Sequence, residues 1–212
     1  MMKKYLPAFI PVVVSFLVSI VVYGSLPEQI PIHFSANGEP DNYMGKPLGP
    51  FLVPLTTLGL FVLMVFLPKV DPRKENYTRF QGSYVLIVSV IIWFLAAIHV
   101  IVLMYALGYN LHLNTVFPIG TGILFLILGN YMPKVKHNYF VGVKTPWTLA
   151  NEKVWYRTHR FAGKVFMFIG IVLIGMVFIP QSYIYPTSLG VIIGGTLLIT
   201  FASYYYYKTI HD

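Results

Sequence analysis

The sequence predicts an all-α polytopic membrane protein with six transmembrane helices. Of its 212 residues 57% are hydrophobic and only 10% are charged, and the charges are confined to short clusters. Four windows, residues 5–27, 47–68, 80–133 and 165–207, contain no Asp, Glu, Lys or Arg. Since a spanning helix needs about 20 mostly apolar residues, each window can cross a bilayer at least once.

The two longer windows each contain a break and therefore hold two spans. Leu107-Gly108-Tyr109-Asn110 interrupts the third window, and the segment from Pro180 to Pro186 interrupts the fourth with residues typical of helix ends and membrane interfaces. The predicted spans are residues 6–25, 49–67, 82–106, 113–131, 163–180 and 188–207.

The positive charges predict the orientation. Counted segment by segment, fourteen of the fifteen Lys and Arg residues fall on one side of these spans, and Lys46 alone falls on the other. By the positive-inside rule the basic side is the cytoplasm. We therefore expect a multi-pass protein of the cell membrane with both termini cytoplasmic, whose formal charge of +8 sets orientation and does not mark direct binding of nucleic acid.

The loop after the first span, residues 26–48, predicts a short ordered extracellular lobe. Ile30, Ile32 and Phe34 alternate as in a strand, and Asn37-Gly38 is a strong turn dipeptide. His33, Glu39 and Asp41 could in principle ligate a divalent ion, but their spacing matches no established metal motif. We favour a solvated loop with caps and turns over a metal site. Recognition of an extracellular partner is the functional alternative.

Two features lie inside the spans. His99 is an ionisable residue in the third span, which is compatible with a proton relay, but no carboxylate lies within any predicted span. A neutral histidine bonded to a neighbouring hydroxyl or carbonyl is the favoured interpretation. Gly190 and Gly194 in the last span predict close helix packing, with a dimer interface as the alternative.

The segment before the fifth span predicts an amphipathic interfacial helix. Thr145 is a suitable N-cap and Pro146 a suitable first helical residue. At 100° per residue one face of the helix is mainly apolar, and a basic stripe lies beside it. The first face contains Val154, Trp155, Thr158, Phe161 and Ala162; the stripe contains Lys153, Arg157, Arg160 and Lys164. Such a helix would lie flat at the cytoplasmic surface before bending into the fifth span.

Two segments echo one another. Leu67-Pro68-Lys69-Val70 follows the second span, Met132-Pro133-Lys134-Val135 follows the fourth, and each precedes an Asn-Tyr pair. Four residues are too few for a repeat, and a proline stop followed by cytoplasmic lysines explains the echo more simply.

Several motifs resemble the signature of the SdpI/YfhL family of bacterial membrane proteins. They are Gly129-Asn-Tyr-Met-Pro133, the run from Asn138 to Leu149, Val154-Trp155 and Thr158-His159-Arg160. The external loop, with Leu26-Pro27, Ile30-Pro31, His33-Phe34 and Gly38-Glu39, is similar to the external domain often found at the N-terminus of that family. The resemblance implies a first helical hairpin over residues 1–68, with its lobe at 26–48, and a four-helix SdpI-like membrane domain over 69–212, with a cytoplasmic loop at 132–163.

The resemblance also implies immunity against a secreted, membrane-active peptide toxin of the sporulation-delaying kind. A family member can in addition act as a signalling receptor that captures a cytoplasmic repressor at the membrane. The expected toxin-facing residues are His33, Asn37, Glu39 and Asp41. The expected partner or interface residues are Asn138, Thr145, Pro146, Trp147, Trp155, Arg157, Thr158, His159 and Arg160.

Two other functional classes compete with immunity. A small-molecule or ion transporter is the alternative that His99 favours, although no intramembrane carboxylate accompanies it. An enzyme is not expected, because no Ser/His/Asp or metal constellation has a recognised spacing. The chain has no cysteine, which excludes disulfides, thiolate metal sites and cysteine nucleophiles, and we expect no cofactor.

Overall fold

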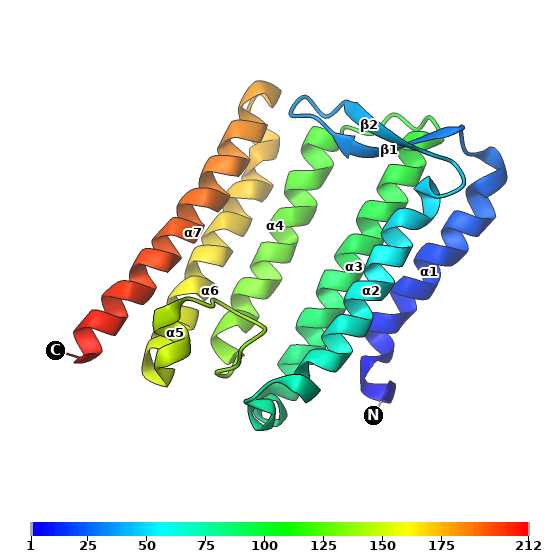
Figure 1. Cartoon of the computed structure of the whole chain (residues 1–212). Coiled ribbons are helices and arrows are strands. Elements are labelled where there is room, and N and C mark those ends of the chain that lie inside the picture. Colours follow the sequence, from blue (N-terminus) through cyan, green and yellow to red (C-terminus); the bar gives the residue numbers. More distant parts are fainter. Residues whose placement is uncertain (1, 212) are drawn as a thin grey trace. The chain divides into compact units, whose positions relative to one another are not determined.

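Six long helices dominate the computed structural model, which describes residues 2–211 (Figure 1). They are α1 (Leu6–Val22), α2 (Gly49–Val70), α3 (Gln81–Ala106), α4 (Leu113–Tyr131), α6 (Glu152–Gly175) and α7 (Gln181–His211). All six are long and apolar enough to span a membrane, which confirms the predicted fold class and the number of spans. The smaller elements are β1 (Gln29–Phe34), β2 (Pro40–Gly45) and α5 (Pro146–Ala150), with short 3-10 turns between.

The chain forms two compact units, which are described separately below. The first consists of Met1–Val65 and Val88–Phe117, and the second of Phe66–Ile87 and Pro118–Asp212. The terminal residues 1 and 212 lie outside the described residues, so the predicted cytoplasmic termini stay a prediction. The predicted division of the chain between residues 68 and 69 also stays a prediction.

In the first unit a β-hairpin lies across the ends of α1, α2 and α3 (Figure 1). Strands β1 and β2 pair antiparallel, with Ile30 opposite Met44, and Gly38 adopts a φ of 80° in the turn. Both the strand and the Asn-Gly turn expected in this loop are therefore confirmed. Ile30 is 1% exposed and packs with Leu26 and Leu103, so one apolar residue of the strand fixes the hairpin to the helices.

In the second unit, glycines allow α4 and α6 to approach at backbone distance. A Cβ atom on Gly129 would lie 2.8 Å from the carbonyl of Gly163, and one on Gly122 would lie 2.8 Å from the carbonyl of Gly170. The two pairs are seven residues apart on both helices, so they lie along one antiparallel seam. Small residues let membrane helices pack by close van der Waals contact.

Two predicted helix boundaries are wrong. The helix expected over residues 145–164 divides at Asn151, whose side chain caps α6, and α6 then runs without a break from Glu152 to Gly175. The basic, aromatic segment is thus mostly the first turns of the fifth span and not a separate flat helix. Helix α7 begins at Gln181, seven residues before the predicted start, and contains Pro186 in its interior.

The glycines of the last span do not serve the expected packing. A Cβ atom on Gly190 or Gly194 would meet nothing within 4 Å, whereas one on Gly195 would lie 2.6 Å from Ile169 of α6. Gly195 therefore makes the close contact between α6 and α7. Gly190 and Gly194 instead leave open space beside it.

Candidate functional site

The four expected toxin-facing residues lie exposed on the hairpin of the first unit. His33 on β1 and Asp41 on β2 form a cross-strand pair with 2.5 Å between Nδ1 and Oδ1. Asn37 in the turn donates to Glu39 Oε2 over 3.2 Å. Their side chains are held by one another and by the turn, so the hairpin presents a defined polar surface.

The tip of the hairpin is held by contacts with α3 and with the start of α4. Asn114 Nδ2 donates to the carbonyl of Asn37 over 2.7 Å, and a Cβ on Gly38 would lie 2.5 Å from Asn114 Oδ1. Phe34 packs edge-on against Tyr105 with ring centroids 5.4 Å apart. A shallow hollow of about 410 Å³ lies beside the hairpin. It is lined by Pro27, Gln29, Pro31, Glu39, Pro40, Tyr43, Tyr105 and Ala106.

The loop between α4 and α5 in the second unit carries most of the family signature and is called the signature loop below. It is organised by Asn138, which is fully buried. Its Nδ2 donates to the carbonyls of Lys136 (2.8 Å) and Val141 (2.9 Å). Its Oδ1 accepts the backbone N–H groups of Phe140 (2.9 Å) and Val141 (2.7 Å). One side chain thus satisfies four backbone groups of a loop that has no ladder of its own.

Asp71 and Tyr77 join this loop to the turn that follows α2. The Tyr77 hydroxyl lies 3.0 Å from Asp71 Oδ2 and 3.1 Å from Asn138 Oδ1, and Tyr139 N–H donates to Asp71 Oδ2 over 2.9 Å. Asn76 Nδ2 donates to the carbonyl of His137 over 2.7 Å. The two Asn-Tyr pairs that follow the echoing segments therefore lie in loops that are bonded to each other.

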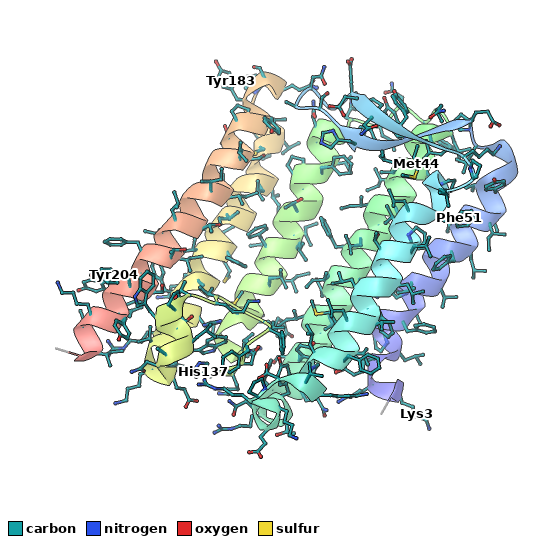
Figure 2. All side chains as sticks on the ribbon, in the orientation of Figure 1. Lys3, Met44, Phe51, His137, Tyr183 and Tyr204 are labelled. Atoms are coloured by element: carbon teal, nitrogen blue, oxygen red, sulfur yellow. The ribbon has the colours of Figure 1, made fainter. Side chains whose placement is uncertain are left out.

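Three aromatic rings stack in the interior beside Asn138. Trp155 is stacked on His159 with ring centroids 4.0 Å apart, and its ring lies 4.9 Å from the tilted ring of His137. Trp155 Nε1 donates to the carbonyl of Val135 over 2.9 Å. Figure 2 shows His137 among the loop side chains beside α5 and α6. The ring stack ties α6 to the loop that follows α4.

Hydrogen bonding fixes the form of His159. Its Nδ1 donates to the carbonyl of Trp155 over 2.8 Å, and its Nε2 accepts the N–H of Val143 over 3.0 Å. A ring that donates at one nitrogen and accepts at the other is the neutral tautomer. Gly142 passes directly over it with a φ of 117°, and a Cβ there would lie 2.3 Å from Nε2. The loop can close on His159 only with glycine at this position.

The ring of His137 is only partly satisfied. Its Nε2 is buried and has no hydrogen-bond partner among the described residues. Burial lowers the pKa of His137 below its ordinary value of 6.5, and the nearby positive charge of Arg73 lowers this pKa further. His137 is therefore neutral near pH 7.

Helix α5 is a single capped turn that packs on α7. Thr145 and Thr148 form the capping box, in which Thr145 N–H donates to Thr148 Oγ1 over 2.9 Å. Thr145 Oγ1 also donates to Ser203 Oγ over 3.0 Å, and the Trp147 ring lies 5.1 Å from that of Tyr204. The predicted cap and first residue, Thr145 and Pro146, are confirmed.

Burial divides the expected interface residues into two sets. The buried set contains Asn138, Thr145, Trp155, Thr158 and His159. Pro146, Arg157 and Arg160 are exposed, and Trp147 is half-buried. The side chains of the first set pack in the interior. Those of the second set are accessible to a partner.

Comparison with known proteins identifies the family. The family model described as "SdpI/YfhL protein family" matches residues 134–207, and one described as "Domain of unknown function (DUF1648)" matches residues 10–58. The chain is 33% identical over 210 residues to a protein of Bacillus subtilis (strain 168) named immunity protein SdpI, and the similarity covers 99% of both chains. This chain belongs to the SdpI/YfhL family. No solved structure matches it.

The SdpI/YfhL match begins just before the signature loop and includes the three stacked rings. Three contributors to this cluster, Asp71, Tyr77 and His137, were not among the predicted site residues. The echoing Asn-Tyr pairs were the available signal for Tyr77. Asp71 offered a weaker one, because it is an acidic residue directly beyond an apolar span.

His99 in the first unit has the hydroxyl partner that was expected. It is 2% exposed, and its Nε2 lies 2.8 Å from Ser19 Oγ of α1. Ser19 Oγ in turn donates to the carbonyl of Pro50 at the start of α2 over 2.7 Å. Among residues 2–211 no carboxylate forms an ion pair with His99. The histidine thus links α1 and α3 through a neutral polar network.

Proposed function

We propose that this membrane protein confers immunity against a secreted peptide toxin that acts on the cell membrane. The observation that carries the proposal is the similarity to immunity protein SdpI along 99% of both chains, which leaves no large region of either protein unmatched. The six helices long enough to span a membrane place the protein where such a toxin would act.

The hairpin of the first unit is the proposed toxin-binding surface. Its exposed polar residues His33, Asn37, Glu39 and Asp41 stand next to a hollow lined largely by proline and tyrosine. Loops held by a rigid scaffold are the usual carriers of binding residues, and this hairpin is held by Ile30 and Asn114. The proposed orientation puts it outside the cell, since Lys46 is the single Lys or Arg of residues 26–48.

The test is survival of a toxin-sensitive Gram-positive bacterium that expresses the chain. We expect expression to raise survival under challenge with a sporulation-delaying-type toxin, and the double variant His33→Ala, Asp41→Ala to abolish the gain. An exposed pair of polar side chains contributes little to stability, so the variant should accumulate normally in the membrane. Glu75→Ala, an exposed change outside the hairpin, is the control and should protect like the wild type. Equal killing with and without the protein, across several toxins of this kind, would refute the proposal.

We further propose a receptor role, in which the basic end of the second unit holds a cytoplasmic repressor once toxin is bound. Of the accessible members of the signature, Pro146 and the half-buried Trp147 on α5 are the proposed contact. Coupling requires that toxin binds two arrangements of the helices with different affinity.

The test is a pull-down of soluble proteins by the full chain with and without toxin. We expect the chain to capture a soluble protein only when toxin is present. The double variant Pro146→Ala, Trp147→Ala should lose this capture, and Lys134→Ala should keep it. Capture independent of toxin would contradict the receptor role.

Transport is the weaker candidate, because the buried His99 is bonded to Ser19 and has no ion-pair partner among the described residues. Proton-coupled carriers usually pair an intramembrane histidine with a carboxylate. We expect vesicles that contain the protein to show the same proton flux with wild type and with His99→Leu.

A further inference from the structure

An open groove runs along α6 and α7 in the second unit. It has a volume of about 440 Å³, and its lining includes Phe161, Val165, Phe168, Gly190, Gly194 and Leu198. Gly190 and Gly194 form an open wall, because a Cβ on either would meet nothing within 4 Å. Both helices are long and apolar enough to span the membrane, so the groove runs along membrane-spanning segments.

A basic hollow of about 390 Å³ adjoins this groove. Its lining is Tyr156, Arg157, Arg160, Phe161, Lys164 and Tyr206. The three cations are exposed, and among residues 2–211 none of them has a carboxylate partner. Arg160 lies 5.6 Å from the Tyr156 ring centroid, so an aromatic ring holds the guanidinium at the rim of the hollow.

The two hollows are adjacent, since Phe161 and Lys164 line both. A lysine at such a boundary lays its apolar stem along the groove and keeps its ammonium group in the polar layer. The combined site is therefore apolar along its length and strongly cationic at one end. Its complement is an amphipathic anion.

We propose that this site binds one anionic phospholipid. The phosphate lies among Arg157, Arg160 and Lys164, and one acyl chain fills the groove beside Gly190 and Gly194. Arginine suits the headgroup because its planar donors bind phosphate oxygens in pairs. A free phosphate would leave the apolar groove empty. A two-fold dimer across the groove would bring two sets of unpaired cations to the same membrane depth, where they would repel.

The lipid site goes beyond immunity and does not depend on it. It assigns the exposed Arg157 and Arg160 to a membrane lipid and leaves the α5 residues Pro146 and Trp147 for a protein partner. It also gives the cations of α6 a role in fixing the helix to one leaflet, since anionic lipids attract basic groups near the bilayer surface.

Native mass spectrometry of the delipidated full chain tests the proposal. The protein is titrated with phosphatidylglycerol, with phosphatidylcholine of the same acyl chains, or with glycerol phosphate. We expect one phosphatidylglycerol to bind at least about tenfold more tightly than phosphatidylcholine. The triple variant Arg157→Gln, Arg160→Gln, Lys164→Gln should lose this selectivity, and Gly194→Leu should weaken phosphatidylglycerol binding by a similar factor.

Each variant has a matched control. Lys134→Gln, Lys136→Gln, Lys153→Gln removes the same charge from the loop and the first turn of α6, outside the hollow. Gly59→Leu adds the same side chain in α2, where a Cβ also meets nothing within 4 Å. Both controls should bind phosphatidylglycerol like the wild type, and circular dichroism should show equal helicity for all variants.

Four results would overturn the proposal. Selectivity unchanged in the triple variant would show that the cations do not hold the headgroup. Unchanged binding in Gly194→Leu, or displacement by glycerol phosphate at the concentrations at which the lipid binds, would show that the groove is not part of the site. A dimer that Gly194→Leu dissociates would show that a second copy occupies the groove.

Discussion

Individual polar residues hold the signature loop together because it has no regular backbone hydrogen bonding. Asn138 bonds four backbone groups, and Asp71 accepts from Tyr77, Arg73 N–H and Tyr139 N–H. A buried group that loses its partner costs more than the partnership itself contributed. The order of residue types in this loop is therefore constrained at the level of single atoms.

Asn138→Leu should destabilise the protein strongly. Each buried N–H or C=O left unsatisfied costs about 1–3 kcal/mol, and the substitution orphans the N–H groups of Phe140 and Val141 among others. Thermal unfolding in detergent micelles measures the effect as a large fall in Tm. Asn130→Leu, at an exposed position of α4, is the control and should leave Tm nearly unchanged. Equal Tm values for the two variants would show that the hydrogen bonds of Asn138 contribute nothing.

His137 should make the protein sensitive to acid. Its pKa is lowered in the folded state, mainly by burial, so the unfolded chain binds the proton more readily once the pH falls below about 6.5. The stability contributed by the neutral ring is fully present above pH 6.5, the ordinary pKa of histidine. It is lost as the pH falls from there toward the lowered pKa of the folded state. His137→Phe keeps an aromatic ring next to Trp155 and removes the titration. We expect Tm of the variant to fall less than that of the wild type between pH 7 and pH 5, and parallel curves would contradict this.

At the scale of elements, close helix contacts are set by which glycines face a neighbour. Gly163 of α6 faces the carbonyl of Gly129, whereas Gly175 of the same helix faces open space. Glycine content alone cannot separate the two, because facing depends on the rotation of each helix about its axis. The same reason explains why Gly195, and not Gly190 or Gly194, meets α6.

Gly163→Ala should loosen the α4–α6 pair. The added methyl group would lie 2.7 Å from the Gly129 carbonyl oxygen, and overpacking of this kind costs about 1–3 kcal/mol, which exceeds the gain of about 1 kcal/mol in helix propensity. Gly175→Ala, with nothing within 4 Å, should keep or raise Tm. Denaturation of the two variants side by side is the measurement, and a Gly163→Ala protein at least as stable as Gly175→Ala would rule out the close contact.

At the scale of the whole molecule, six spans place successive loops on alternating sides of the membrane. The absence of cysteine allows a clean test of the proposed orientation. Asn37→Cys on the hairpin and Ala150→Cys at the end of α5 are both exposed positions. In intact cells a membrane-impermeant maleimide should label Asn37→Cys only, and Ala150→Cys should react after permeabilisation. The reverse pattern would invert the orientation, and labelling of both in intact cells would exclude an odd number of spans between them.

The sequence by itself determined the fold class, the number of spans and the hairpin. These follow from local properties, namely the length of uncharged runs, the alternation of Ile30, Ile32 and Phe34, and the Asn-Gly turn. The cap of α5 was also local, because Thr145 and Thr148 are one turn apart. Helix boundaries at Asn151 and Gln181 were missed, because a polar N-cap and an early proline are compatible with more than one helix start.

Only the tertiary structure decided which residues cover the apolar face of the segment around Trp155. The amphipathic pattern correctly placed Val154, Trp155 and Thr158 on one face, but a lipid surface and a protein interior demand the same pattern. The Trp155 ring contacts two histidine rings. Asn138 is bonded to Tyr77, which is also bonded to Asp71, in a turn more than sixty residues earlier in the chain. Contacts of this kind join residues that are distant in sequence, and periodicity carries no information about them.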